Sequence, residues 1–216
     1  MDTQEKALVL RTSDKKHRSY GGFQWPDEIG AIVTCPDWKP TKECGNGLHG
    51  ALWGEGNGGL FSWDYDAVWQ VVEVNVSDII DLDGKVKFPS CKLVHVGNQQ
   101  SATEYIFRNG GAKCAIIGGT ATAGEYGTAT AGYKGTATVG NGGTATAGKY
   151  GTATAGYGGT ATAGEYGTAT AGECGIIQIA YSQGRKKIAI AYVGENGIQK
   201  NTAYKLDNNY QFTIAD

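Results

Sequence analysis

The stretch CGNGLHGALWGEGNGG, residues 44–59, contains the side chains of this sequence that are most suited to holding a ligand. It places Asn46, His49 and Trp53 among many glycines, and Glu55 follows closely. Amide, imidazole and indole groups all hydrogen-bond to bound molecules, and glycines let the backbone approach such a molecule closely. The stretch is therefore a candidate binding segment. The alternative is that His49 is a turn residue or makes a hydrogen bond within the core.

A second stretch, LRTSDKKHRSYGGF at residues 10–23, adds cationic and aromatic side chains. It contains Arg11 and Arg18, which can pair with an anionic group, together with His17 and Tyr20. The two stretches predict a small nucleotide-like ligand, bound by Arg11, Arg18, Asn46, His49 and Trp53.

Catalytic and metal-binding motifs are missing from the sequence. There is no P-loop, no G-x-S-x-G and no HExxH. The acidic segment DIIDLDG, residues 78–84, lacks the spacing of a calcium loop. The five cysteines include no CxxC pair, which argues against a disulfide framework or a zinc site. We expect no metal, no cofactor and no catalytic residue, and hence a protein that acts by binding.

Charge and hydropathy exclude two classes of partner. The net charge of −2 gives no broad attraction to nucleic acid or to an anionic membrane. No apolar run approaches the length of a membrane span, and the first ten residues do not have the pattern of a signal peptide. The expected location is the cytoplasm, or the host cytoplasm if the protein is encoded by a phage.

Composition divides the chain into three parts. All five tryptophans lie in the first 69 residues, and no arginine occurs between Arg108 and Arg185. We predict an N-terminal α+β domain (1–109), a repeat array with caps (110–175) and a C-terminal β meander (176–216). In the first part, strands are expected at 6–12, 30–35, 68–76 and 85–96. A short helix is expected at 101–109, where Ser101 and Glu104 have capping-box spacing.

The central part repeats an octapeptide, close to G-T-A-T-A-G-x-x, seven times from Gly119 to Cys174. Successive side chains of an extended strand point to opposite faces, so the threonines share one face and the alanines the other. The glycines that flank x-x are expected to supply positive φ at sharp corners. A fixed period of strand and turn predicts a β-solenoid. Eight residues form a cramped coil, so we predict 16 residues per coil, about three and a half coils, and alanine inside.

Two alternatives remain for this array: a disordered Gly/Thr/Ala linker, or a solenoid with threonine inside, which would bury hydroxyls that need partners. Ile116, Ile117, Ile176 and Ile177 are expected to cover the two ends. The corner tyrosines either stack as a ladder or offer a contact surface. The predicted interaction face comprises Thr120, Thr122, Thr128, Thr130, Thr144, Thr146, Thr152, Thr154, Thr160, Thr162, Thr168 and Thr170, with Tyr126, Tyr133, Tyr150, Tyr157 and Tyr166 at the corners.

The repeat AGYGGTATAGEYGTATAG, residues 155–172, resembles the tandem repeats of bacterial ice nucleation proteins. That resemblance implies a β-solenoid. The whole layout resembles uncharacterised phage and bacterial proteins in which a domain of unknown function with a CGNGLHG-like segment precedes short repeats. The order of an arginine strand, a Gly-Leu-His segment and a β-rich core also resembles ADP-ribosyltransferase-like toxins. No complete motif of those toxins is present, so no catalytic residue is assigned.

Three functions follow from these patterns. The first is a non-catalytic binding or assembly protein on a β-solenoid scaffold, of phage or bacterial origin, that associates with a protein partner or with itself. The second is a nucleotide-using enzyme in the N-terminal domain. The third is ice binding through the Thr-x-Thr faces. We rank ice binding below a structural role, because three or four rungs make a patch of only roughly 15–20 Å.

Overall fold

The computed structural model describes residues 5–215. The chain forms two compact units, Met1–Ile116 and Ile117–Asp216, each with its own sheets. Residues 176–216, which composition sets apart from the repeats, lie in the second unit together with them. Within the described chain no helix is long and apolar enough to cross a membrane.

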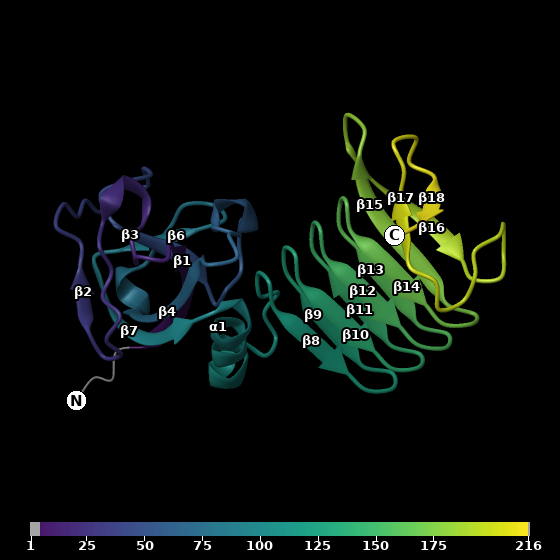
Figure 1. The fold of residues 1–216 in the computed structure, drawn as a ribbon, viewed down its shortest axis with the longest axis horizontal. Helices are drawn as coiled ribbons and strands as arrows, with labels where there is room; N and C mark the ends of the chain where they lie inside the picture. The colour runs from purple at the N-terminus through teal and green to yellow at the C-terminus, as the bar shows by residue number, and fades with distance from the viewer. Residues whose placement is uncertain (1–4, 216) are drawn as a thin grey trace. The chain divides into compact units, whose positions relative to one another are not determined.

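The first unit is built on an antiparallel seven-stranded sheet with the order β2-β7-β4-β1-β3-β6-β5 (Figure 1). Its central strands β1 and β4 are almost continuously buried, because both of their faces are covered. One face carries α1, which packs on β1, β4 and β7, and the other carries a core around Val9, Trp25 and Phe88. The strands are β1 (Lys6–Ser13), β2 (Ile32–Thr34), β3 (Leu48–Leu52), β4 (Val68–Asn75), β5 (Ile80–Asp81), β6 (Val86–Phe88) and β7 (Ser90–Gly97).

The helical elements of this unit are short. They are α1 (Gln99–Ile106), the 3₁₀ turns η1 (Tyr20–Gly22), η2 (Gly58–Leu60) and η3 (Val76–Asp78), and the π-helical segment η4 (Phe107–Gly111). The predicted capping box is wrong: the helix begins two residues earlier, and Asn98 caps it by accepting from the Ser101 amide at 2.9 Å. The predicted strand at 85–96 is two strands, divided at Pro89, which has no N–H to donate to a ladder.

The second unit is a β-solenoid of 16-residue coils, as the repeat predicts (Figure 1). Each strand pairs in parallel with the strand 16 residues away, so that Thr136 lies beside Thr120 and Thr152. Odd and even units therefore form two separate sheets. The strands are β8 (Thr120–Ala123), β9 (Thr128–Ala131), β10 (Thr136–Val139), β11 (Thr144–Ala147), β12 (Thr152–Ala155), β13 (Thr160–Ala163) and β14 (Thr168–Ala171).

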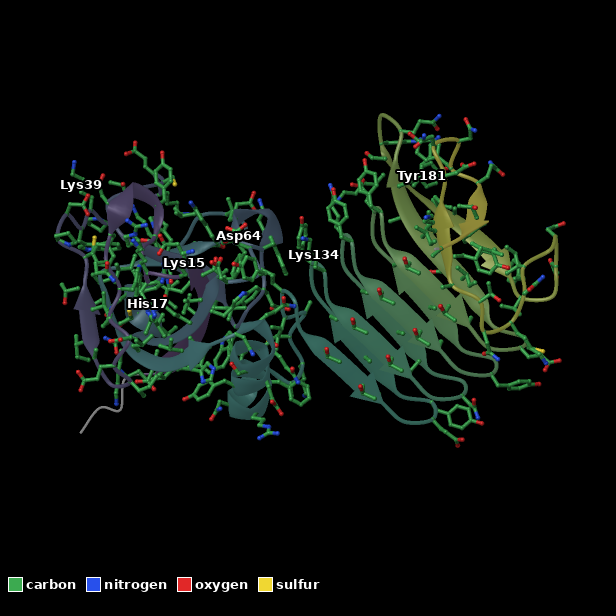
Figure 2. All side chains as sticks on the ribbon, viewed as in Figure 1. Lys15, His17, Lys39, Asp64, Lys134 and Tyr181 are labelled. Atoms are coloured by element: carbon green, nitrogen blue, oxygen red, sulfur yellow. The ribbon has the colours of Figure 1, made fainter. Side chains whose placement is uncertain are left out.

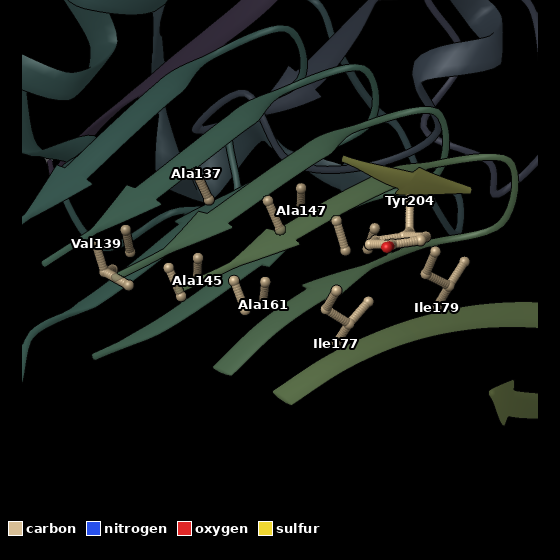
Figure 3. Packing of buried hydrophobic residues seen from close by; sticks show 14 of the residues in the cluster. Ala137, Val139, Ala145, Ala147, Ala161, Ile177, Ile179 and Tyr204 are labelled. Carbon is tan, nitrogen blue, oxygen red and sulfur yellow. The ribbon is translucent and has the colours of Figure 1, made fainter. Parts of the chain in front are cut away.

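Alanine fills the interior of the solenoid, and threonine lies outside. From β9 onward every inward position of the repeat is buried, including Val139 and Ala145. The outward threonines are exposed or half-buried. Figure 3 shows these small side chains of the two sheets pointing toward one another, with Ile177, Ile179 and Tyr204 at one end. The predicted alanine interior is confirmed, and the linker and the threonine-inside alternatives are wrong.

The corners are built differently from the prediction. Positive φ falls on the second corner residue, for example Tyr126 (φ 56°) and Tyr150 (φ 59°), and not on the glycines that flank the corner pair. From Gly127 onward, the flanking glycines for which a Cβ can be tested are required by close approach to other atoms. A Cβ on Gly135 would lie 2.9 Å from the carbonyl oxygen of Gly119 in the neighbouring coil. Glycine therefore lets the coils pack, and the sharp bend comes from a residue held in the left-handed region.

The C-terminal end of the solenoid is closed by two additions to different sheets. β15 (Ile176–Ser182) continues one sheet and pairs antiparallel with β16 (Lys186–Tyr192). β17 (Tyr204–Leu206) pairs antiparallel with β14, and β18 (Phe212–Ile214) pairs with β17. The C-terminal segment is β-rich and antiparallel as predicted, but its strands are shared between two sheets and do not form one meander.

The predicted isoleucine caps are only partly correct. Ile177 and Ile179 point inward and are buried. Ile176 takes the register position of Thr160, on the outer surface, so it does not cover the end. At the other end Ile117 is buried in the second unit, while Ile116 belongs to the first.

Candidate functional site

The larger regular surface of the solenoid is the outer side of the sheet formed by β8, β10, β12 and β14. Its strands carry only threonine on the outward positions. Two threonines of one strand lie roughly 7 Å apart, and neighbouring strands lie about 4.8 Å apart. We call this surface the four-rung face: it comprises Thr120, Thr122, Thr136, Thr138, Thr152, Thr154, Thr168 and Thr170. Thr136 and Thr138, which are not in the predicted interaction face, complete it.

The opposite sheet carries a smaller version of the same surface. This three-rung face comprises Thr128, Thr130, Thr144, Thr146, Thr160 and Thr162. The next strand, β15, replaces the threonine pair with Ile176 and Gln178, and Gln178 Oε1 accepts a hydrogen bond from Thr162 Oγ1 at 3.1 Å. The regular array therefore ends one strand earlier on this side.

The threonine hydroxyls form an ordered grid that faces outward. Figure 2 shows their oxygens in parallel rows over the strands of the solenoid, in line with the residue-by-residue register of the coils. β-branched side chains have a restricted χ1, so the positions of the hydroxyl and methyl groups are set in advance. The faces can thus bind a partner that is itself regular at the spacing of the rungs.

The corner tyrosines divide between two edges. On the edge that follows β9, β11 and β13, the Tyr133 and Tyr150 rings lie 5.5 Å apart and the Tyr150 and Tyr166 rings 5.2 Å apart. The Lys149 amine lies 5.2 Å from the Tyr166 ring centre and 3.4 Å from the Glu165 carboxylate. These tyrosines form the predicted ladder. On the other edge, Tyr126 and Tyr157 are exposed and offer a contact surface.

In the first unit, three of the five predicted ligand residues line one cavity of about 750 Å³. Arg11 comes from β1, His49 from β3, and Asn46 from the loop that precedes β3. Tyr20 and Trp25 also line it. The volume is within the usual range for small-molecule sites.

The other two predicted residues do not line this cavity. Arg18 is exposed and pairs with Asp14 at 2.8 Å, where it helps to hold the loop that follows β1. Trp53 is half-buried at the end of β3, in the left-handed region, where it packs against the core. Their predicted contribution to a ligand site therefore has no support from their positions.

The cavity is electrostatically unusual. Burial lowers the pKa of the Arg11 guanidinium to about 9. Burial, together with the charges of Lys85 and Lys87, lowers the pKa of His49 to about 4. His49 is therefore neutral at pH 7, and its Nε2 atom has no hydrogen-bond partner within the described structure. Lys85 donates to Cys44 Sγ at 2.9 Å and lowers the pKa of that thiol.

Comparisons with known proteins give two kinds of match, to a family model and to curated proteins. A family model described as a domain of unknown function (DUF7666) matches residues 7–108. The ice nucleation protein of Pseudomonas fluorescens is 45% identical over 107 residues, which cover 49% of this chain and 9% of that protein. Ice nucleation protein InaU of Pantoea ananas is 38% identical over 108 residues, which cover 49% and 10%. The chain resembles ice nucleation proteins.

The resemblance to ice nucleation proteins concerns a small part of their length. An ice nucleation protein of Pseudomonas syringae is 43% identical over 104 residues, which cover 47% of this chain and 8% of that protein. The chain thus spans about a tenth of the length of these curated relatives. No solved structure matches it. The β-solenoid scaffold and its ice-nucleation-like repeat are established; the predicted phage origin, protein partner and cytoplasmic location stay predictions.

Proposed function

We propose that the second unit is a non-catalytic binding module that binds ice through its threonine faces, chiefly the four-rung face. This reverses the order in which the sequence patterns ranked a structural role and ice binding. Two findings support the change: the similarity to ice nucleation proteins and the way in which residue variation is distributed over the repeat.

The distribution of variation is the observation that carries the proposal. All seven units keep threonine at both outward positions, whereas the corner pairs read EY, YK, NG, KY, YG, EY and EC. Corner and face positions are both accessible to solvent. A strand would accept valine, isoleucine or tyrosine at an outward position equally well. Since folding does not require threonine there, the invariance of threonine points to a requirement of the surface itself.

The chemistry of the faces suits a water lattice. Threonine offers a hydroxyl that donates and accepts beside a methyl group, and the grid repeats it at the spacing of the strands. Among the described threonines of the array, only Thr162 uses its hydroxyl for another side chain. The remaining hydroxyls are available to ordered water. No charge interrupts the outward positions of β8, β10, β12 and β14.

The size of the faces sets the kind of activity. Four rungs span about 14 Å, from three intervals of about 4.8 Å. A patch this small can adsorb to an existing crystal but offers little area on which a new crystal forms. We therefore expect inhibition of ice recrystallisation and shaping of ice crystals at micromolar protein, with only weak nucleation.

The test compares two matched lysine variants. Thr138→Lys places a charge in the middle of the four-rung face, and Thr146→Lys places it at the same strand position of the three-rung face; both threonines are half-buried. Recrystallisation inhibition and partition into growing ice are measured for both variants and the unaltered protein. We expect Thr138→Lys to abolish most of the activity and Thr146→Lys to retain most of it.

Two results would contradict the proposal. One is an unaltered protein that neither partitions into ice nor slows recrystallisation. The other is activity that both lysine variants retain in full. Loss of activity in both variants would keep ice binding but would assign it to both faces. Circular dichroism of each variant checks that the solenoid is intact.

A further inference from the structure

The cavity of the first unit contains a buried cation without a counter-charge. Arg11 is only 6% exposed, and Nη1 donates to the amide oxygen of Gln70. Within the described chain Arg11 makes no ion pair, and its Nε atom has no partner. Cys91 is the ionisable group whose charge would favour the Arg11 cation, but burial raises the pKa of that thiol to about 12, so it is neutral. Burying an unpaired charge is costly, which indicates that a counter-ion comes from outside the chain.

Further cations increase the positive charge of this region. Lys87 is fully buried, and its amine donates to the backbone oxygens of Glu43 at 2.9 Å and Gly45 at 3.4 Å. Lys85 lies on the cavity wall. One carboxylate, Asp37, also lines the cavity, where it accepts from Asn46 Nδ2 at 2.7 Å and from Cys35 Sγ at 3.0 Å. Three cations against one carboxylate leave the region positive.

The walls of the cavity add flat aromatic surface. The Arg11 guanidinium lies 3.5 Å from the centre of the Trp25 ring, and the Trp25 indole donates to Ser19 Oγ at 3.2 Å, which fixes its orientation. Phe23 and Phe61 line the same space. Tyr20 also lines it, yet its side chain is fully exposed. An exposed aromatic ring at the edge of a cavity can close over a planar ligand.

We propose that this cavity binds a nucleotide, with the phosphate near the Arg11 guanidinium and the base against the aromatic wall that includes Tyr20. The phosphate supplies the counter-charge that the chain lacks. A neutral His49 has an unpartnered Nε2 in the same cavity, where it pairs with a hydroxyl or an N–H group of the ligand. The proposal concerns binding only and is independent of ice binding by the second unit.

The test uses the full chain and three probes: AMP, adenosine and inorganic phosphate. Isothermal titration calorimetry at constant ionic strength is expected to show saturable binding of AMP. Adenosine lacks the charge-assisted bonds and inorganic phosphate lacks the stacking, so each should bind at least about tenfold more weakly.

Three variants locate the site. Arg11→Gln should weaken AMP binding at least about tenfold, and Tyr20→Ala should weaken it roughly fivefold or more. Tyr65→Ala is the matched control, because Tyr65 is equally exposed but does not line the cavity. Its affinity for AMP should be unchanged. If Arg11→Gln fails to fold, the comparison of Tyr20→Ala with Tyr65→Ala still decides, since both rings are exposed and contribute little to stability.

Several outcomes would overturn the proposal. The first is an absence of AMP binding up to millimolar concentration. The second is AMP binding that Tyr20→Ala leaves unchanged. The third is inorganic phosphate that binds as tightly as AMP, which would make the site a general anion site. None of these results bears on recrystallisation inhibition, so failure here is distinguishable from failure of the proposed ice binding.

Discussion

The interior of the solenoid is thin and filled by alanine, so a larger side chain there should lower the stability of the second unit. Ala145 is fully buried, and the register places it beside Ala129 and Ala161 in the neighbouring coils. The inward positions of the repeat are alanine in both sheets apart from Val139, so the space between the sheets holds little more than a methyl group from each side. Val139 shows that the interior accepts two further carbons at one place, where the side chain is still buried. Leucine at residue 145 would add three.

Ala145→Leu should destabilise the second unit by about 1–3 kcal/mol, the usual cost of an overpacked core. For a unit of this size, a loss of about 2 kcal/mol lowers the melting temperature by roughly 10 °C. Ala145→Val should lie between leucine and the unaltered protein. The control is the neighbouring exposed residue: Thr144→Val should change the stability by about 0.5 kcal/mol or less.

The measurement is thermal unfolding followed by far-UV circular dichroism, with a second probe of the aromatic corners. Two separate melting transitions would show that the two units unfold independently. The transition that shifts in Ala145→Leu then belongs to the second unit. A leucine variant as stable as the unaltered protein would mean that the interior is loosely packed. A larger loss for Thr144→Val than for Ala145→Leu would refute the assignment of the faces.

Two further predictions concern pH and association. The pKa of His49 is about 4 in the fold against about 6.5 unfolded, so the unfolded chain binds more protons between those values. Stability of the first unit should therefore be greatest above pH 6.5 and fall toward pH 4 by about 1–2 kcal/mol, because solvent screens a half-buried imidazole. In urea unfolding at several pH values, His49→Gln should show a shallower dependence on pH, and an equal slope would contradict this assignment. The flat threonine faces and exposed corners also predict a side-by-side dimer: light scattering should show a dimer at high concentration that Thr138→Lys dissociates, and a strict monomer in both would refute it.

The solenoid could be predicted from the sequence because its information is local and repeated. The period of eight sets the strand length, and the alternation of threonine and alanine assigns the two faces. The corner geometry could not be read in the same way. Gly148 and Gly151 look like turn glycines, yet the turn depends on positive φ at Tyr150, a residue type that rarely adopts it. Glycine is needed at these positions because the backbone of the neighbouring coil lies too close for a Cβ atom. This contact depends on the register of the coils, which the repeat alone does not give.

Some of the residues in and around the cavity could be predicted from the sequence, and others could not. Residue types single out Arg11, Asn46 and His49, but Lys87 lies in the segment KVKF, where it looks like an exposed residue of a strand. The pairing of β3 with β6 places Lys87 directly beside His49, and the structure buries it completely. Gln70 becomes a partner of Arg11 in a similar way, through the pairing of β1 with β4. Contacts of this kind depend on the order of strands that are far apart in the sequence, so no local sequence pattern predicts them.

The caps determine how far the threonine grid can act. On one sheet β17 pairs antiparallel with β14, and on the other β15 carries Ile176 and Gln178 at the positions of a threonine pair. Both changes end the grid while the interior continues through Ile177 and Ile179. Core and surface are therefore specified separately, by alternate residues of the same strands. The chain keeps a continuous core to the end of the solenoid, but it limits the ordered hydroxyl surface to four rungs on one side and three on the other. For the ice binding that we propose, a surface of this size favours adsorption to ice over its nucleation.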